Sequence, residues 1–189
     1  PSSAAFWVAA ALLAGSALEL SGVLLNPYRT GFFEVVRRMG AQIDLRVEAE
    51  SPEPIGTISV RPSKLKGWSV PQEWVPSLID EIPLLVLLGS QAEGEMSITG
   101  AGELKVKESD RILATARVLG SLGVRVKTHH DGFFIRGGQK LSSGTVDPEG
   151  DHRLAMSAAV ASFVAPVDLL QPEVAAVSDP LFWENFARC

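Results

Sequence analysis

An internal repeat of about 75 residues constrains the fold of this chain more than any other feature. The phrases RRMGAQIDLRV (37–47) and GSLGVRVKTHH (120–130) share the order of helix end, stopping glycine and alternating strand. A third copy begins at Asp151 and lacks this final strand. Repeats of this length are supersecondary units that bury one shared core.

Hydrophobic periodicity predicts the elements of each copy, with Ser2-Ser3 as the cap of the first helix. The predicted helices are 4–13, 32–39, 84–91, 107–122, 154–163 and 180–188. The predicted strands are 17–20, 42–47, 57–60, 95–99, 124–127 and 167–170. This alternation indicates an α/β fold. We expect the sheets to lie outside a common interior formed by the apolar helices 4–13, 84–91 and 154–163.

Composition limits the classes of partner. Of the 189 residues, 46% are hydrophobic, which is enough for a packed core, and the net charge of −5 argues against nucleic-acid or anionic-membrane surfaces. Cys189 is the only cysteine, which favours a reducing compartment. The apolar stretch 4–14 is too short for a membrane span and has no basic leader. Because Pro1 replaces an initiator methionine, we expect a fragment or a processed chain.

Two charged clusters precede or open predicted helices. Asp80 and Glu81 open an apolar helix, where a capping role is favoured and a catalytic role remains possible. Lys107 and Arg111 are four residues apart on one predicted helical face, so they repel unless an anion lies between them. Glu108 can pair with Arg111 and also transfer a proton, although a solvated first turn with ordinary ion pairs is equally consistent.

The third cluster is Asp151-His152-Arg153. Asp151 is a natural N-cap, whereas cations in the first turn oppose the helix dipole. A carboxylate or phosphate bound to Arg153 explains this placement. Elsewhere, His129-His130 predicts a surface turn before a hairpin. The spacing of the histidines predicts no metal site, and the glycines form no phosphate-binding loop.

These clusters, in this order, resemble the 5-enolpyruvylshikimate-3-phosphate synthase family. The resemblance covers essentially the whole chain, and its most specific phrases are KESDR and DHRLAMS. The matching stretches are PSSAAF (1–6), NPYRTGFFEVVRRMGA (26–41), IDEIPLLVLLGSQAEG (79–94), GELKVKESDRI (102–112), DHRLAMS (151–157) and SDPLFWENF (178–186).

The resemblance implies an α/β (α+β) fold, namely the inside-out α/β barrel domain of the enolpyruvyl transferases, with three βαβαββ-type repeats. The expected units are about 1–67, 68–138 and 139–189, which together make one domain. The complementary first domain of the same enzyme is then absent from this chain. We therefore expect the chain to fold alone but not to turn over, because the family's active site lies between the two domains.

The implied reaction transfers the enolpyruvyl group of phosphoenolpyruvate to the 5-hydroxyl of shikimate 3-phosphate. The resemblance implies that Asp80 is the base on that hydroxyl and that Glu108 protonates the methylene of phosphoenolpyruvate. The substrate-binding residues it implies are Lys107, Arg111, His152 and Arg153. We also expect an anion near Arg111 and Arg153. Two departures are Val177, where many members have a phosphate-binding lysine, and Glu103, where some have an asparagine.

The implied partners are the two substrates and the complementary domain, with no cofactor, metal, nucleic acid or membrane. The expected location is the cytoplasm, or the plastid if the source is a plant. One alternative is a non-catalytic α/β module for binding or assembly. The other is the related UDP-N-acetylglucosamine enolpyruvyl transferase, which shares the fold but lacks the KESDR phrase.

Overall fold

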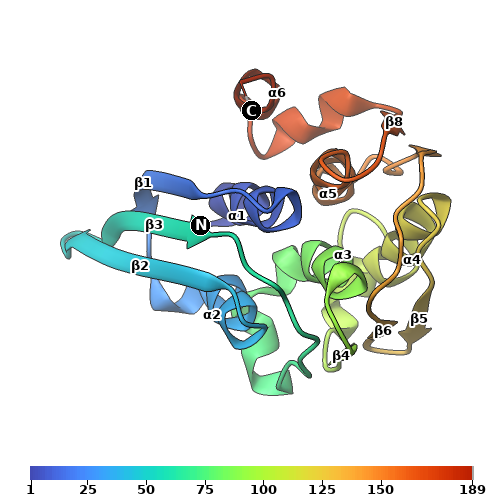
Figure 1. Ribbon diagram of the computed structural model, residues 1–189, viewed down its shortest axis with the longest axis horizontal. Coiled ribbons are helices and arrows are strands. Elements are labelled where there is room, and N and C mark those ends of the chain that lie inside the picture. The colour runs from blue at the N-terminus through green and yellow to red at the C-terminus, as the bar shows by residue number, and fades with distance from the viewer. Residues whose placement is uncertain (189) are drawn as a thin grey trace.

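Three apolar helices form the centre of the molecule. The structure, a computed structural model, describes residues 1–188. Helices α1 (Ser2–Ala14), α3 (Ile82–Gln91) and α5 (His152–Ala161) all contact one another (Figure 1). Every residue of α3 from Ile82 to Ser90 is buried, as expected for a helix that is apolar all round. The predicted interior is confirmed.

The first sheet covers one side of this centre. It is antiparallel, with strand order β1-β3-β2. Its strands are β1 (Leu18–Leu24), β2 (Gln42–Ala49) and β3 (Ile55–Arg61), and α2 (Gly31–Arg38) leads into β2. Helix α2 ends before Gly40, which has φ +98°, so this glycine acts as the predicted stop.

The second sheet repeats this plan and the third is smaller. The second is antiparallel, with order β4-β6-β5. Its elements are β4 (Glu95–Ile98), α4 (Arg111–Ser121), β5 (Val126–His129) and β6 (Gly132–Arg136). The third pairs β7 (Gly144–Val146) with β8 (Val167–Leu169) in parallel, before α6 (Phe182–Phe186). All three sheets lie outside the helical centre (Figure 1).

Five short 3₁₀ helices connect these elements. Two of them carry or precede the charged clusters, because Asp80 lies in one and Lys107 directly follows another. They are Pro27–Arg29, Gln72–Ser77, Ile79–Glu81, Gly102–Val106 and Pro172–Val177. None of the helices described within residues 1–188 is long and apolar enough to cross a membrane.

The predicted helix over 107–122 is wrong at its start. Helix α4 begins at Arg111, because the Asp110 carboxylate accepts hydrogen bonds from the backbone N–H groups of Ile112 and Leu113, both at 3.2 Å. Lys107 and Glu108 therefore lie in the bend before the helix, not on a helical face shared with Arg111.

The predicted helix caps also need correction. Pro1, not Ser2-Ser3, is at the N-cap of α1, and the Ser2 hydroxyl instead accepts a hydrogen bond from Arg29 at 3.2 Å. Glu81 is at the N-cap of α3, but its side chain makes no capping bond. The Asp80 carboxylate is likewise directed elsewhere, toward Arg111. Tertiary contacts thus compete with local capping for these polar groups.

Other element boundaries shift by a few residues. Strand β1 runs on to Leu24 through an irregularity at Gly22, whose φ of +69° suits glycine. His129 belongs to β5 and pairs with Gly132, so the turn is His130-Asp131 rather than His129-His130. The final helix is only Phe182–Phe186 instead of 180–188, and Cys189 lies outside the described residues.

Candidate functional site

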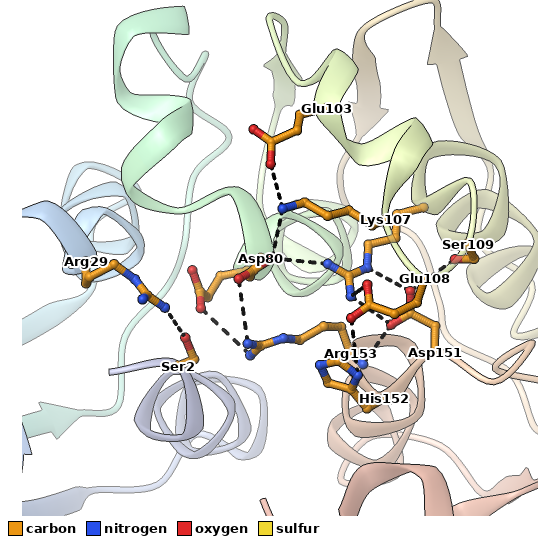
Figure 2. A network of polar contacts seen from close by, with 12 residues as sticks. Ser2, Arg29, Asp80, Glu103, Lys107, Glu108, Ser109, Asp151, His152 and Arg153 are labelled. Carbon is orange, nitrogen blue, oxygen red and sulfur yellow. Dashed lines mark hydrogen bonds and ion pairs between the residues drawn. The ribbon is translucent and has the colours of Figure 1, made fainter. Parts of the chain in front are cut away.

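The six predicted site residues come together at the N-terminal ends of three helices (Figure 2). Asp80 precedes α3, and the Lys107-Glu108 pair precedes α4, whose first residue is Arg111. His152 and Arg153 open α5. Helix N-termini carry partial positive charge, so their convergence favours bound anions. The residues that the family resemblance assigned to one active site do lie together, although none of their expected roles follows from proximity alone.

Arg111 is the hub of the cluster. Its side chain is only 1% exposed, and its guanidinium is surrounded by three carboxylates. Nε donates to Asp151 Oδ2 at 2.7 Å, Nη1 to Asp80 Oδ1 at 3.1 Å, and Nη2 to Glu108. A second bond from Nη2 reaches Asp151 Oδ1 at 3.3 Å, which makes that pair bidentate.

The pKa values of the Arg111–Asp151 pair reflect this pairing. Burial lowers the pKa of Arg111, but the hydrogen bonds and charge of Asp151, together with Glu108 and Asp80, outweigh it and leave the pKa raised. Burial raises the pKa of Asp151, but Arg111 outweighs it and leaves that pKa below its usual range. Both groups are therefore held in their charged forms.

Asp151 is a site residue that the sequence pattern identified only as a cap. It does cap α5, accepting the backbone N–H of Arg153 at 2.9 Å, and it also accepts the Ser109 hydroxyl at 3.0 Å. Its side chain is fully buried. A single carboxylate thus fixes the starts of α4 and α5 relative to each other. No sequence pattern indicated this second role, because Asp151 and Arg111 are 40 residues apart.

An anionic group does lie between Lys107 and Arg111, as their expected repulsion requires, and it is the Asp80 carboxylate. Asp80 Oδ1 is 3.1 Å from Arg111 Nη1 and 3.9 Å from Lys107 Nζ. Lys107 has a closer partner in Glu103, whose Oε1 is 2.6 Å from Nζ. Glu103 therefore neutralises the lysine from the outer side of the cluster (Figure 2).

Arg153 differs from Arg111 in how its charge is matched. Its Nη2 is 3.7 Å from Asp80 Oδ2, and its Nη1 is 4.0 Å from Glu81 Oε1. Both separations exceed hydrogen-bond length. Among the described residues, its buried Nε has no hydrogen-bond partner. This guanidinium therefore retains donors for an anion, whereas the carboxylates around Arg111 already occupy its donors.

His152 is nearly buried beside Glu108, with Nδ1 3.7 Å from Glu108 Oε1. Burial lowers the pKa of His152, and Arg153 lowers it further, while Glu108 and Asp151 oppose this in part. The imidazole is therefore neutral at pH 7, so one ring nitrogen donates a hydrogen bond and the other accepts one.

The two departures from the family pattern, Val177 and Glu103, lie in different surroundings. Val177 ends the 3₁₀ helix Pro172–Val177 and is 76% exposed. Because valine is apolar, it supplies no charge at this position. Glu103 pairs with Lys107, as described above. Within residues 1–188, no group of three or more histidine, cysteine, aspartate or glutamate side chains is placed to hold a metal ion.

Known proteins match the chain along its whole length. The profile of EPSP synthase (3-phosphoshikimate 1-carboxyvinyltransferase) matches residues 1–186. A 3-phosphoshikimate 1-carboxyvinyltransferase of Synechococcus sp. (strain CC9605) is 45% identical, over 99% of this chain and 43% of the relative. One from Roseiflexus sp. (strain RS-1) is 46% identical, over 100% of this chain and 44% of the relative.

Solved structures agree. EPSP synthase from Acinetobacter baumannii superposes with a TM-score of 0.94 at 37% identity, over 99% of this chain and 45% of that one. The enolpyruvyl transferase NikO from Streptomyces tendae gives 0.71 at 19% identity, over 98% of this chain and 41% of that one, which shows the shared fold alone. The expected enolpyruvyl transferase fold is confirmed. The chain, which spans about 44% of the length of such curated relatives, belongs to the EPSP synthase family.

Proposed function

We propose that this chain is one half of an enzyme that transfers the enolpyruvyl group of phosphoenolpyruvate to the 5-hydroxyl of shikimate 3-phosphate. The observation that carries the proposal is the single polar cluster. It combines two partly exposed carboxylates, Asp80 at 28% and Glu108 at 46%, with Lys107 and the incompletely paired Arg153. Such a cluster supplies acid, base and cations on one open face.

The proposed chemistry is an addition followed by an elimination. Asp80 takes the proton of the 5-hydroxyl while the hydroxyl oxygen bonds to the enol carbon of phosphoenolpyruvate. Glu108 protonates the methylene carbon. The resulting methyl group then returns a proton to Glu108, the bond between the former enol carbon and the phosphate oxygen breaks, and Asp80 passes the hydroxyl proton to the departing phosphate. The products are the enolpyruvyl ether and inorganic phosphate.

The positions of the two carboxylates support these roles. Both are bonded to Arg111, one through Nη1 and one through Nη2, so a single buried guanidinium sets their separation. Both also reach the surface, where substrate can approach. Arg111 is then a positioning residue, and its expected direct contact with phosphoenolpyruvate is a secondary role.

The remaining residues are proposed to bind the anionic substrates. Lys107, 25% exposed, would meet the phosphate of shikimate 3-phosphate, in exchange for its contact with Glu103. Arg153 would hold the carboxylate or phosphate of phosphoenolpyruvate through its free donors. Neutral His152 would donate a hydrogen bond beside it.

The second half of the site is proposed to come from a complementary domain. We propose that the expected units 1–67, 68–138 and 139–189 form one domain, because helices from all three meet in one centre. The cluster lies on the face of this domain, and a partner is needed to enclose substrate and exclude water. Without that partner we expect no turnover.

A phosphate-release assay with both substrates tests this proposal. The 189-residue chain alone should be inactive, and adding the complementary half should restore release. Glu108→Gln should then lower the rate by roughly 10²- to 10⁴-fold. Glu103→Gln, which removes a more exposed carboxylate of the same cluster, is the matched control and should change it little. Turnover by the chain alone, or an active Glu108→Gln variant, would contradict the proposal.

A further inference from the structure

Glu81 is a buried carboxylate to which the proposed reaction gives no role. It is 4% exposed, at the point where the 3₁₀ helix Ile79–Glu81 meets α3. Within the described part of the chain, its Oε1 is buried without a hydrogen-bond partner. A buried polar atom left unpaired is costly, so its retention calls for an explanation.

The nearest cation to this oxygen is itself incompletely paired. Arg153 Nη1 lies 4.0 Å from Glu81 Oε1, and Arg153 Nε is buried without a partner among residues 1–188. A closed carboxylate–guanidinium pair would have its atoms about 2.7–2.9 Å apart. Glu81 and Arg153 therefore attract each other through charge without forming the hydrogen bonds that would lock them.

The groups facing Glu81 come from every neighbouring element. Asp80 adjoins it, Arg153 faces it from α5, and the Ser2 hydroxyl and the Pro1 amino group approach from the start of α1. Arg29 adds a more distant positive charge and donates to Ser2 (Figure 2). Burial raises the pKa of Glu81; Ser2, Arg153 and Arg29 offset this in part, whereas Asp80 adds to it.

We propose that Glu81 is a positioning residue that acts as an internal counter-anion for Arg153 and competes with the incoming anionic group of the substrate. In the empty site, its charge holds the guanidinium toward α3. A bound phosphate or carboxylate uses the donors of Arg153 and weakens this attraction. The inference rests on the proposed anion-binding role of Arg153.

A coupling between anion binding and proton uptake follows. When an anion occupies Arg153, Glu81 loses part of the interaction that favours its charged form and also gains a negative neighbour. Both effects favour protonation of Glu81. By linkage, lowering the pH through the range in which Glu81 takes up its proton tightens anion binding.

Sulfate binding to the 189-residue chain tests the inference without any need for catalysis. Sulfate is a dianion throughout pH 5–8, so its own charge does not change. The dissociation constant is measured by calorimetry across this range at constant ionic strength. Glu81→Gln should bind sulfate about fivefold more tightly than the unmodified chain at pH 7 and should depend less on pH. Glu81→Ala should show the same direction if the first variant folds poorly.

Three further variants separate the possible causes. Glu103→Gln removes a carboxylate of the same cluster and should keep the pH dependence of the unmodified chain. His152→Gln removes the imidazole beside Arg153, so a slope that survives in this variant and is lost in Glu81→Gln reports Glu81. Arg153→Gln should weaken sulfate binding roughly 10- to 100-fold; if affinity is unchanged, the proposed anion site is wrong. Unchanged affinity and pH slope in both Glu81 variants, with Arg153 still required, would overturn the role of Glu81 alone.

Discussion

Helices α4 and α5 each have an arginine just after a capping aspartate, but the two arginine side chains differ in how they are paired. Arg111 and Arg153 both stand in the first turn of a helix whose N-cap aspartate bonds to backbone N–H groups. Arg111 is enclosed by three carboxylates, whereas Arg153 lies between two carboxylates without a hydrogen bond to either. A guanidinium whose donors are bonded to protein carboxylates holds the site in place. One that lacks such hydrogen bonds can bind an anionic ligand.

The difference originates in the two capping aspartates. Within residues 1–188, the side chain of Asp110, which caps α4, accepts hydrogen bonds from backbone N–H groups alone. Asp151, which caps α5, also makes a bidentate contact with Arg111 across the interface between the two helices. Residues with the same local role thus differ in their tertiary role.

The largest expected effect is from Asp151→Asn. Asparagine can still cap α5, so the change removes mainly the charge paired with buried Arg111. We expect a loss of about 3 kcal/mol in the free energy of unfolding, because breaking a buried ion pair leaves one partner uncompensated. Urea denaturation followed by circular dichroism measures it.

Asp110→Asn is the matched control, since it alters the other capping aspartate and spares Arg111. Its effect on the free energy of unfolding should stay within about 0.5 kcal/mol. Equal losses in the two variants would mean that capping, rather than the buried pair, distinguishes the two helix starts.

Unlike Asp151→Asn, Arg153→Gln should affect anion binding more than stability. It should weaken binding of phosphoenolpyruvate or sulfate roughly 10- to 100-fold, because a hydrogen bond to a charged group contributes about 1.5–3 kcal/mol. Stability should change less than in Asp151→Asn, since Arg153 makes no closed side-chain ion pair among the described residues. Calorimetric titration measures the change in affinity, and denaturation of the same protein measures the change in stability. Strong unfolding with unchanged affinity would reverse the assignment of the two arginines.

The dependence of stability on pH should contain separable contributions from His152 and Asp151. The pKa of His152 is lowered in the folded state, so the unfolded chain binds its proton first and stability falls as pH drops below about 6.5. The pKa of Asp151 is also lowered, so its contribution is present above about pH 3.9 and is lost as pH falls below that value. His152→Gln should remove the first contribution and leave the second, whereas Asp151→Asn should remove the second and deepen the first, because the Asp151 charge partly offsets the lowering of the His152 pKa. Denaturation curves from pH 3 to 8 provide the measurement.

The smallest effect is expected from Arg117→Gln. Arg117 and Glu149 form a bidentate pair at 2.6 and 2.7 Å, but the two side chains are 55% and 34% exposed. Water screens such a pair, so the loss should lie at about 0–1 kcal/mol in the free energy of unfolding. A loss as large as that in Asp151→Asn would show that geometry, rather than burial, controls the strength of these pairs.

The amino-acid sequence determined much of the fold. Apolar helices such as α3 have no polar face, so only a shared interior can bury them. Gly40 and Gly123 ended their helices because each adopts a positive φ, at +98° and +82°. The resemblance of the IDEIPLLVLLGSQAEG, KESDR and DHRLAMS phrases to the family's motifs also implied that Asp80, Glu108, Arg111 and Arg153 serve one site.

Only the tertiary structure decided which charges neutralise one another. The predicted helical face joining Lys107 to Arg111 does not exist, because Asp110 starts α4 at Arg111 and leaves Lys107 in a bend beside Glu103. Asp151 is 40 residues from Arg111, and nothing local to either residue specifies their contact. Local patterns fix where a helix starts and which side chains it offers. The partners of a buried charge depend on how separate helix ends pack, since electrostatic energy in the interior depends on distances between elements.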